Sequence, residues 1–444
     1  MSNMSEQSHL KPLFKITCIG LITLIGATIV FAAGFGSAYL LTQVGILPVT
    51  APASDEQTQL PATPTPEWST ENPWPGGTPT PMAIPTPQTD DEQEFQIFWE
   101  AWDLIQRNFY GPLPDMQTVS YAAIHGVLEE LGDPYTAFIE PEPAAILSED
   151  ASGEFEGIGA YVNMTEEGAL EISGVFEGGP AEQAGIQEGD RVLAVDGVDI
   201  SGMTLYEAIG LIRGPSGTQV TLLIMREGIE EPFEVVVTRA RLEIPIIEIE
   251  MRDDGVGYIR LYEFSANARE QMEGGLKELL AQDPVGIVFD LRMNPGGWLD
   301  QAIEVADLFL DDGTVLIERW SDGREEFLPR GGVRDGDIGE EIPLVVLVDR
   351  GTASASEIVA GALQDHERAI LIGEVTFGKG SVQRPFTLSD GSELRVTIAH
   401  WFTPDDQEIH GHGLEPNIEV PWPEEETEDD PQLERAVEYI LTGE

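Results

Sequence analysis

The residues best suited to chemistry in this chain lie in two short turns, one around a serine and one around a lysine. The 444 residues include only four lysines, and two of them, Lys11 and Lys15, precede the first hydrophobic stretch. Lys379 lies between two glycines, a setting unsuited to a solvated surface amine, and Ser354 lies 25 residues upstream, after an apolar run that ends at Val348. A serine after a buried strand and a lysine in a tight turn can form a nucleophilic pair. A hydrolase is therefore our first hypothesis.

Ser354 is expected to open a helix that continues to Leu363. A serine at that position is exposed at the carboxyl end of its strand, and the helix dipole favours an oxyanion that develops beside it. The ordinary alternative is a helix N-cap, a role that Ser356 can fill equally well.

Lys379 must be a neutral amine to accept the serine proton. Lysine ordinarily has a pKa of about 10.4, whereas a useful base needs a pKa of about 7–8. Because the acidic chain favours the ammonium form, burial must supply the decrease, and Phe377, Gly378 and Gly380 suit such a pocket. Gln383, four residues further on, can hydrogen-bond the amine and orient it. The alternative is a lysine buried in an ion pair.

A third turn rich in glycine follows the apolar run that ends at Asp290. Its glycines, Gly296 and Gly297, can direct backbone N–H groups into a site. Together with the amide of Ala355 they are our candidates for an oxyanion hole. A plain loop is the alternative.

These turns together resemble a known family. The matching motifs are Asp290-Leu291-Arg292, Asn294-Pro295-Gly296-Gly297, Thr352 through Glu357, Ala360-Gly361-Ala362, Thr376 through Gly380, and Gln383. They are similar to the carboxyl-terminal processing proteases (S41-type Ser/Lys peptidases with a PDZ domain), over roughly residues 92–422. The resemblance implies Ser354 as nucleophile, Lys379 as general base and Gln383 as the orienting third member, in an endopeptidase that cleaves near protein carboxyl termini. Met293 and Asn417 depart from the family pattern, and we expect them to affect substrate fit or packing more than chemistry.

Residues 154–240 resemble a PDZ domain, with short strands separated by turns. Such a domain binds a terminal carboxylate with successive backbone N–H groups and pairs an extended peptide with a strand edge. The candidate peptide-binding residues are Gly157, Ile158, Gly159 and Ala160. We expect Arg213 to couple movement of this domain to the protease core; a surface arginine beside a turn is the alternative.

The resemblance and the alternation of elements predict the architecture. Residues 241–423 alternate strands and helices, which indicates an α/β core, and the family implies a crotonase/ClpP-like core with an inserted PDZ domain, mainly β with short helices. Residues 92–153 are predicted to be an N-terminal helical region whose aromatic residues form a small core. Residues 424–444 are predicted to be an acidic tail with a short helix.

The amino terminus is typical of a membrane anchor. The 39 residues after Lys15 carry no charge, and most of those up to residue 47 are apolar, whereas about 20 apolar residues suffice to span a bilayer. Because Lys11 and Lys15 precede this stretch and no basic residue follows before Arg107, the positive-inside rule places the remaining chain outside the cytoplasm. We expect residues 1–47 to be a cytoplasmic tip and a single-pass anchor in a bacterial cell membrane, with an extracytoplasmic catalytic domain. A cleaved signal peptide is the alternative.

Composition and net charge restrict the classes of molecule that the chain is expected to bind. Residues 48–91 are rich in proline and threonine, which favours an extended linker. The formal net charge of −57 repels nucleic acid, and Cys18, the only cysteine, cannot form an intramolecular disulfide. The predicted partners are peptides and proteins with free apolar carboxyl termini and, through the anchor, the membrane. The sequence leaves a homo-oligomer open and predicts no cofactor.

Three other hypotheses compete with the Ser/Lys pair. A Ser-His-Asp triad needs His366 or His400, but His366 lies twelve residues after Ser354 on the same predicted helix and should point away. The segment His410-Gly411-His412 suggests a metal, but no third clustered ligand accompanies it, so no metal is predicted. A catalytically silent PDZ scaffold is the alternative of another class.

Overall fold

The computed structural model describes residues 94–165, 167–329, 338–423 and 429–444. All of them lie within one compact unit, Pro87–Glu444. The predicted anchor and linker, residues 1–91, lie outside the described residues. Within the described ranges, no helix combines the length and apolar character needed to cross a bilayer. The predicted domain boundaries stay predictions.

A six-stranded sheet carries the candidate site. Its order is β10 (Ile247–Met251), β11 (Val256–Leu261), β12 (Gly286–Asp290), β15 (Leu344–Val348), β16 (Ile370–Gly373) and β19 (Ile418–Glu419). The β10–β11 pair is antiparallel and the other pairs are parallel. Strands β12 and β15 are buried at every residue, as expected for parallel strands covered on both faces.

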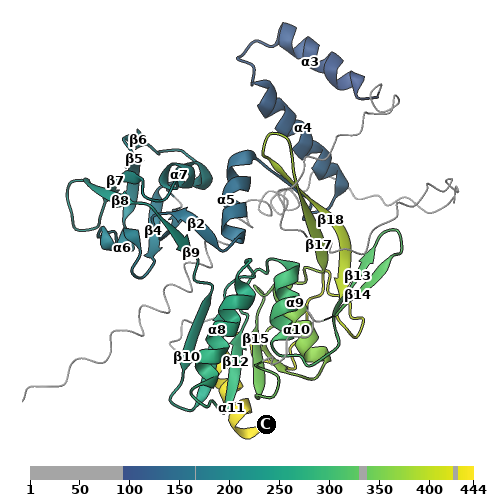
Figure 1. Ribbon diagram of the computed structural model, residues 1–444. Helices are drawn as coiled ribbons and strands as arrows, with labels where there is room; N and C mark the ends of the chain where they lie inside the picture. Colours follow the sequence, from purple (N-terminus) through teal and green to yellow (C-terminus); the bar gives the residue numbers. More distant parts are fainter. Residues whose placement is uncertain (1–93, 166, 330–337, 424–428) are drawn as a thin grey trace, which may run out of the picture. The chain divides into compact units, whose positions relative to one another are not determined.

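Helices cover both faces of this sheet (Figure 1). Side chains of α8 (Ala268–Leu280), α9 (Leu299–Asp307) and α10 (Ala355–Asp365) pack with Phe289 and Val346 on one face. The C-terminal helix α11 (Pro431–Thr442) packs with Val288 and Val345 on the other. Consecutive residues of each strand thus point to opposite layers. The short helix predicted in the acidic tail is part of the core.

A second sheet positions the lysine turn. Its order is β1 (Ala137–Ile139), β18 (Glu393–Phe402), β13 (Thr314–Trp320) and β14 (Glu325–Pro329), with β17 (Ser381–Thr387) also paired to β18. The lysine turn leads directly into β17. The antiparallel β17–β18 pair forms a hairpin.

The PDZ-like segment has its own sheet and core. The sheet has the order β3 (Ala160–Met164), β4 (Leu170–Val175), β5 (Arg191–Val195), β7 (Gln219–Met225) and β8 (Phe233–Thr238), with β6 (Val198–Asp199) on β5. Helices α6 (Pro180–Gln183) and α7 (Leu205–Ile212) accompany it, and β2 (Glu154–Gly157) pairs with β9 (Ala240–Glu243). Among the described strands, β3 pairs only with β4 and leaves one edge free.

The N-terminal helices correct one prediction. Helices α3 (Gln96–Asn108), α4 (Met116–Leu131) and α5 (Pro141–Ala151) form within the region predicted to be helical. However, α3 has no buried residue, and Phe95, Trp99 and Phe109 are 50–59% exposed instead of forming a core. Helical spacing identifies an apolar stripe but does not say what covers it.

Candidate active site

Ser354 lies between β15 and α10 with an unusual backbone. It immediately precedes α10 and has φ 56° and ψ −116°, in a region that glycine populates readily and other residues avoid. Such a conformation costs about 1–3 kcal/mol and is found where surrounding structure imposes it. Gly296 makes the close approach feasible, because a Cβ there would lie 2.8 Å from the Cβ of Ser354.

Glu357 joins the serine turn to the lysine turn. This carboxylate is completely buried, and its Oε2 accepts hydrogen bonds from the backbone N–H of Ser354 (2.8 Å) and of Lys379 (2.9 Å). Its Oε1 accepts from the hydroxyl of Thr376 (2.6 Å) and the N–H of Gly378 (2.7 Å). Burial raises the pKa of Glu357, and the four donors oppose that rise. Two turns 25 residues apart are thus held on a single carboxylate oxygen.

The backbone of the lysine turn is fixed on every side. The carbonyl of Lys379 accepts from the indole Nε1 of Trp401 (3.0 Å), and the carbonyl of Gly378 accepts from Gly411 N–H (2.9 Å). A Cβ on Gly380 would lie 2.5 Å from the backbone nitrogen of His410. The glycines beside the lysine are therefore required by close backbone contact.

Lys379 is partly buried, and its amine lacks a polar partner. Within the described part of the chain, Nζ makes no hydrogen bond or ion pair. Burial and the charge of Arg395 lower the pKa of Lys379, whereas Glu357 and Asp133 oppose the decrease. The alternative of a lysine in an ion pair is wrong for this structure. Burial is the cause that the sequence required for a neutral base.

Gln383 lies near the lysine turn but is bonded to other groups. Its Nε2 donates to Ser381 Oγ (2.8 Å) and more weakly to Thr397 Oγ1 (3.5 Å). The structure shows no hydrogen bond from Gln383 to Lys379. The predicted orienting contact is thus absent from this conformation.

The third turn contacts the serine turn through Asn294. The carbonyl of this buried residue accepts from Ala353 N–H and from the hydroxyl of Ser356, both at 3.0 Å. Its side-chain Oδ1 accepts from Gly296 N–H (2.9 Å). That bond occupies the N–H predicted to face an oxyanion, so in this conformation Gly296 is not a free donor. The N–H groups of Ala355 and Gly297 have no partner among the described residues.

An internal ion pair supports this turn from behind. Asp290 is completely buried, and its carboxylate accepts from the guanidinium of Arg292 at 2.6–3.0 Å. Arg292 also donates to Asp430 and Gln432 at the start of α11. The guanidinium holds the pKa of Asp290 below its usual value despite the burial. The C-terminal helix therefore stabilises the turn that contacts Ser354.

The PDZ-like loop has free backbone donors beside a free strand edge. The carbonyl of Ile158 accepts from Ala181 N–H (2.8 Å), and that of Gly159 accepts from Phe176 N–H (3.0 Å). The N–H groups of Ile158 and Gly159 have no partner in the part of the chain that the structure describes. Ala160, which follows, opens the edge strand β3, and Gly157 ends β2. This arrangement matches what a terminal carboxylate requires.

Arg213 lies at the end of α7 and contacts α5. Its guanidinium forms ion pairs with Glu149 (3.0 Å) and Asp150 (2.5 Å) and lies over the ring of Phe155, 4.6 Å from its centroid. The last residue of α5, Ala151, accepts a hydrogen bond from the indole of Trp298, next to Gly297. Arg213 thus reaches the third turn only indirectly, through α5.

The alternative sites are not assembled. His366 ends the helix that Ser354 begins, and its Nε2 bonds the carbonyl of Thr314 (2.8 Å). His400 and His410 stack on each other, with ring centroids 4.6 Å apart. Across the described ranges, no group of three or more His, Cys, Asp or Glu is arranged to hold a metal.

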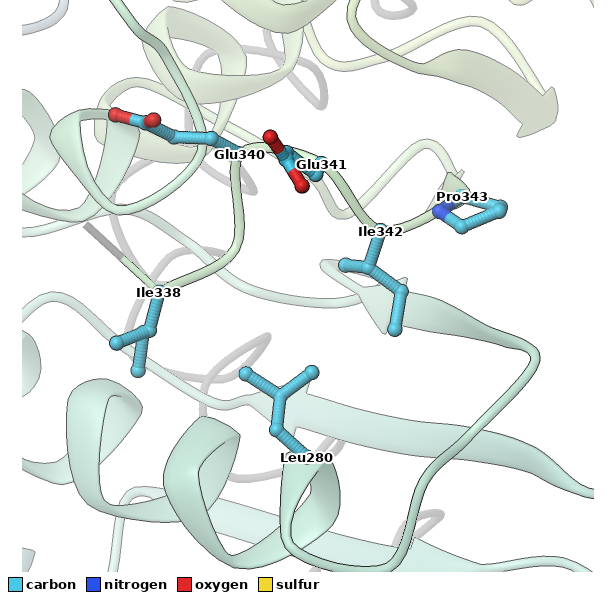
Figure 2. Close-up of a pocket in the computed structure, with 6 residues that line it drawn as sticks. All are labelled: Leu280, Ile338, Glu340, Glu341, Ile342 and Pro343. Atoms are coloured by element: carbon cyan, nitrogen blue, oxygen red, sulfur yellow. The ribbon is translucent and has the colours of Figure 1, made fainter. Parts of the chain in front are cut away.

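The pocket in Figure 2 is not the candidate site. It has a volume of about 460 Å³, and Leu280, Ile338 and Ile342 direct apolar side chains into it from beneath Glu340 and Glu341. None of the predicted site residues lines it.

Comparison with known proteins decides between these hypotheses. Residues 255–420 match the model of peptidase family S41, and residues 171–226 match a PDZ domain model. The chain is 40% identical over 327 residues to the carboxyl-terminal-processing protease of Synechocystis sp., covering 72% of this chain and 75% of that protein. The chain belongs to the carboxyl-terminal processing protease family. The predicted fold class and the prediction of a serine-type peptidase are confirmed.

A second relative agrees with this assignment. The carboxy-terminal-processing protease of Bartonella bacilliformis is 39% identical over 349 residues, which is 77% of this chain and 79% of that protein. A solved structure, the photosystem II D1 C-terminal processing protease, is 30% identical, covering 78% of this chain and 97% of that one with a TM-score of 0.45.

Both departures from the family pattern have structural consequences. Met293 has φ 59°, a region that asparagine tolerates better than methionine, and its N–H donates to Asp349 Oδ1 (2.8 Å). Asn417 Oδ1 accepts from Leu371 N–H (2.8 Å) and from the side chain of Gln364 (3.0 Å). Both residues fix backbone, which agrees with the expected role in packing.

Sequence reasoning missed Glu357 and Asp349. Asp349 Oδ1 accepts from the N–H groups of Met293, Gly351 and Thr352 and so holds two turns together. Glu357 is the third residue of a helix, where glutamate is common for capping reasons. The available signal was an acidic residue within an otherwise apolar helix segment.

Proposed function

We propose that this chain is a membrane-anchored, extracytoplasmic endopeptidase that cleaves near protein carboxyl termini with Ser354, Lys379 and Gln383. The observation that carries the proposal is Glu357, which fixes the serine and lysine turns on one carboxylate while leaving the lysine amine partly buried and unpaired. A serine on a strained turn and a lysine with a lowered pKa are the two components that Ser/Lys catalysis needs.

The proposed reaction proceeds through an acyl-enzyme. Ser354 Oγ attacks the scissile carbonyl carbon while its proton moves to the neutral amine of Lys379, and the Ala355 amide donates to the oxyanion. The C–N bond then breaks as the Lys379 ammonium returns the proton to the leaving amine. A water molecule then attacks the ester carbonyl carbon while its proton moves to the same amine. The bond from that carbon to Ser354 Oγ breaks, the Lys379 ammonium returns the proton to Oγ, and the new carboxyl terminus is released. Gln383 would turn from Ser381 to the amine to orient it.

The PDZ domain supplies substrate selection. The free N–H groups of Ile158 and Gly159 would bind the terminal carboxylate, while the peptide pairs with the free edge of β3. Gly157 and Ala160 frame this loop. Peptide binding would disturb the α5 contacts of Arg213 and so favour the catalytic arrangement of the third turn, a gating step.

The decisive experiment compares two forms of one peptide. Substrates that end in an apolar free carboxylate or in the corresponding amide differ only in terminal charge. We expect the free acid to be cleaved at least about tenfold faster, because the carboxylate receives charge-assisted hydrogen bonds. Ser354→Ala should abolish both rates. Equal cleavage of the acid and amide forms would eliminate carboxylate capture and gating.

Membrane anchoring rests on the uncharged stretch after Lys15. If residues 1–47 anchor the chain, it should stay in the membrane fraction after carbonate extraction, and protease added outside intact spheroplasts should degrade its catalytic domain. Release of the full-length chain by carbonate would contradict the anchor.

A further inference from the structure

The turn between α4 and β1, residues 132–136, reaches the lysine of the candidate site. The amine of Lys379 lies over the ring of Tyr135, with Nζ 5.4 Å from the ring centroid. Among the described residues Nζ has no hydrogen bond or ion pair, so the face of the tyrosine ring shields one side of an unpaired amine.

Further aromatic rings hold the Tyr135 side chain. The ring of His410 meets it edge to face, with centroids 5.9 Å apart, and His400 stacks on His410 in turn. The backbone of His410 also lies in close contact with Gly380, the residue after the lysine. The tyrosine ring is therefore confined between the lysine amine and the loop that packs on the lysine turn.

The same turn is connected to Gln383 by hydrogen bonds. Asp133 accepts from Tyr135 N–H (3.0 Å) and from the hydroxyl of Thr136 (2.6 Å). Thr136 Oγ1 in turn accepts from Thr397 N–H (3.1 Å), and Thr397 lies opposite Gln383 in the β17–β18 pair and accepts from its amide. One short turn thus contacts the surroundings of both the lysine and the glutamine.

We propose that residues 132–136 belong to the active site and that Tyr135 is a positioning residue, which covers the amine of Lys379 and keeps water from it. This inference rests on the proposed role of Lys379 as the base. It gives the N-terminal helical region a direct part in catalysis, because that region supplies the covering ring.

The ring acts on the amine in two opposite ways. It excludes water, which favours the neutral amine, and its π face attracts the ammonium. Burial and the charge of Arg395 lower the pKa of Lys379, whereas the charges of Glu357 and Asp133 raise it. Burial changes the pKa of a lysine more strongly than attraction to one aromatic face does. Removal of the ring should therefore raise the pKa of Lys379.

The first readout is the pH profile of kcat/KM for the full-length chain. Tyr135→Ala should move the acidic limb upward by about one pH unit, with about a tenfold loss at pH 7 that recovers at higher pH. Tyr135→Phe keeps the ring and should stay within about twofold of wild type. Tyr121→Phe is the matched control, because it removes a hydrogen bond from α4 to Asp390 without touching the lysine.

The second readout does not need activity. With four lysines in the chain, acetylation by limiting acetic anhydride can be followed at each one by mass spectrometry as a function of pH. Lys277 is the exposed internal reference, with 59% of its side chain accessible. In wild type, Lys379 should reach half of its plateau at a lower pH than Lys277. In Tyr135→Ala that midpoint should move towards the value of Lys277. Tyr135→Leu, which keeps apolar bulk, should shift it less and serves if the alanine variant does not fold.

Two outcomes distinguish a failure of the Tyr135 inference from a failure of the proposed function. If Lys379→Ala is inactive but the profiles of Tyr135→Ala and Tyr135→Leu match wild type, Tyr135 only packs and this inference is overturned. If Lys379→Ala retains full activity, the proposed function itself fails, whatever Tyr135 does.

Discussion

Two lysines lie in the described part of the chain, and their surroundings differ in almost every respect. Lys277 lies on α8, largely exposed, in an ion pair with Glu273 one turn away. Lys379 lies in a glycine turn, is partly buried without a polar partner for its amine, and has a lowered pKa. An amine becomes a base where water and a pairing carboxylate are both kept from it.

The carboxylates near the two lysines explain this difference. Glu273 binds the amine of Lys277 directly. Glu357 lies close enough to raise the pKa of Lys379 but accepts from three backbone N–H groups and one hydroxyl. Its lone pairs are therefore occupied by the backbone, so it fixes the position of the lysine turn without forming an ion pair with the amine.

The largest expected effect is on the buried lysine. Lys379→Arg keeps the positive charge but cannot act as a base at neutral pH, so kcat/KM should fall by about 10²–10⁴-fold. Circular dichroism should show an intact fold. Lys277→Arg is the control and should retain wild-type turnover. Wild-type activity in Lys379→Arg would remove the distinction between the two lysines.

Replacing the carboxylates should give the next largest effect. Glu357→Gln retains the size of the side chain but puts an NH₂ group against backbone donors, which leaves buried groups unpaired at about 1–3 kcal/mol each. We expect kcat to fall about 10–100-fold and the melting temperature to fall as well. Glu273→Gln should leave both within experimental error. A fully active Glu357→Gln variant would show that the shared carboxylate does not position the turns.

The two lysines should change the free energy of unfolding in opposite directions, with Lys379 lowering it at neutral pH and the ion pair of Lys277 raising it slightly. Because the pKa of folded Lys379 is lowered, the unfolded chain binds a proton that the folded chain does not, at pH values between the lowered pKa and about 10.4. Lys379 therefore destabilises the fold at neutral pH, and this cost disappears as pH rises through that window. Lys379→Met should raise the melting temperature at pH 7 and give a smaller gain at pH 10. The same gain at both values would contradict a lowered pKa.

The smallest effect concerns the exposed ion pair. Lys277→Gln removes a pair of the i, i+4 type, and such pairs contribute about 0.2–0.5 kcal/mol. Urea unfolding should show a loss in this range that shrinks in high salt. A loss of several kcal/mol would mean that Lys277 has a structural role comparable to that of a buried residue.

The sequence was sufficient for the local elements of the site. An apolar run before Ser354 and helical periodicity after it correctly predicted β15 and α10, and the flanking glycines predicted the turn of Lys379. These predictions succeed because strand burial, helix periodicity and glycine turns depend on nearby residues.

The missing parts are contacts between distant segments. Glu357 has the ordinary position of a glutamate at a helix start, and Tyr135 carries no motif of its own. Nothing in the nearby sequence shows what either side chain will touch. The aromatic residues of α3 show the opposite error. Their helical spacing suggested a core, but among the described residues no neighbouring segment buries them. Gln383 was expected on the amine, but Ser381, two residues away, binds its side chain in this structure.

The backbone of Ser354 has a consequence for the history of this sequence. A serine with φ 56° is held where glycine would fit without strain, so replacement by glycine would stabilise the fold while removing the proposed nucleophile. Most proteins lie only slightly above the stability they need. A lineage released from selection for proteolysis should therefore drift readily to glycine at this position.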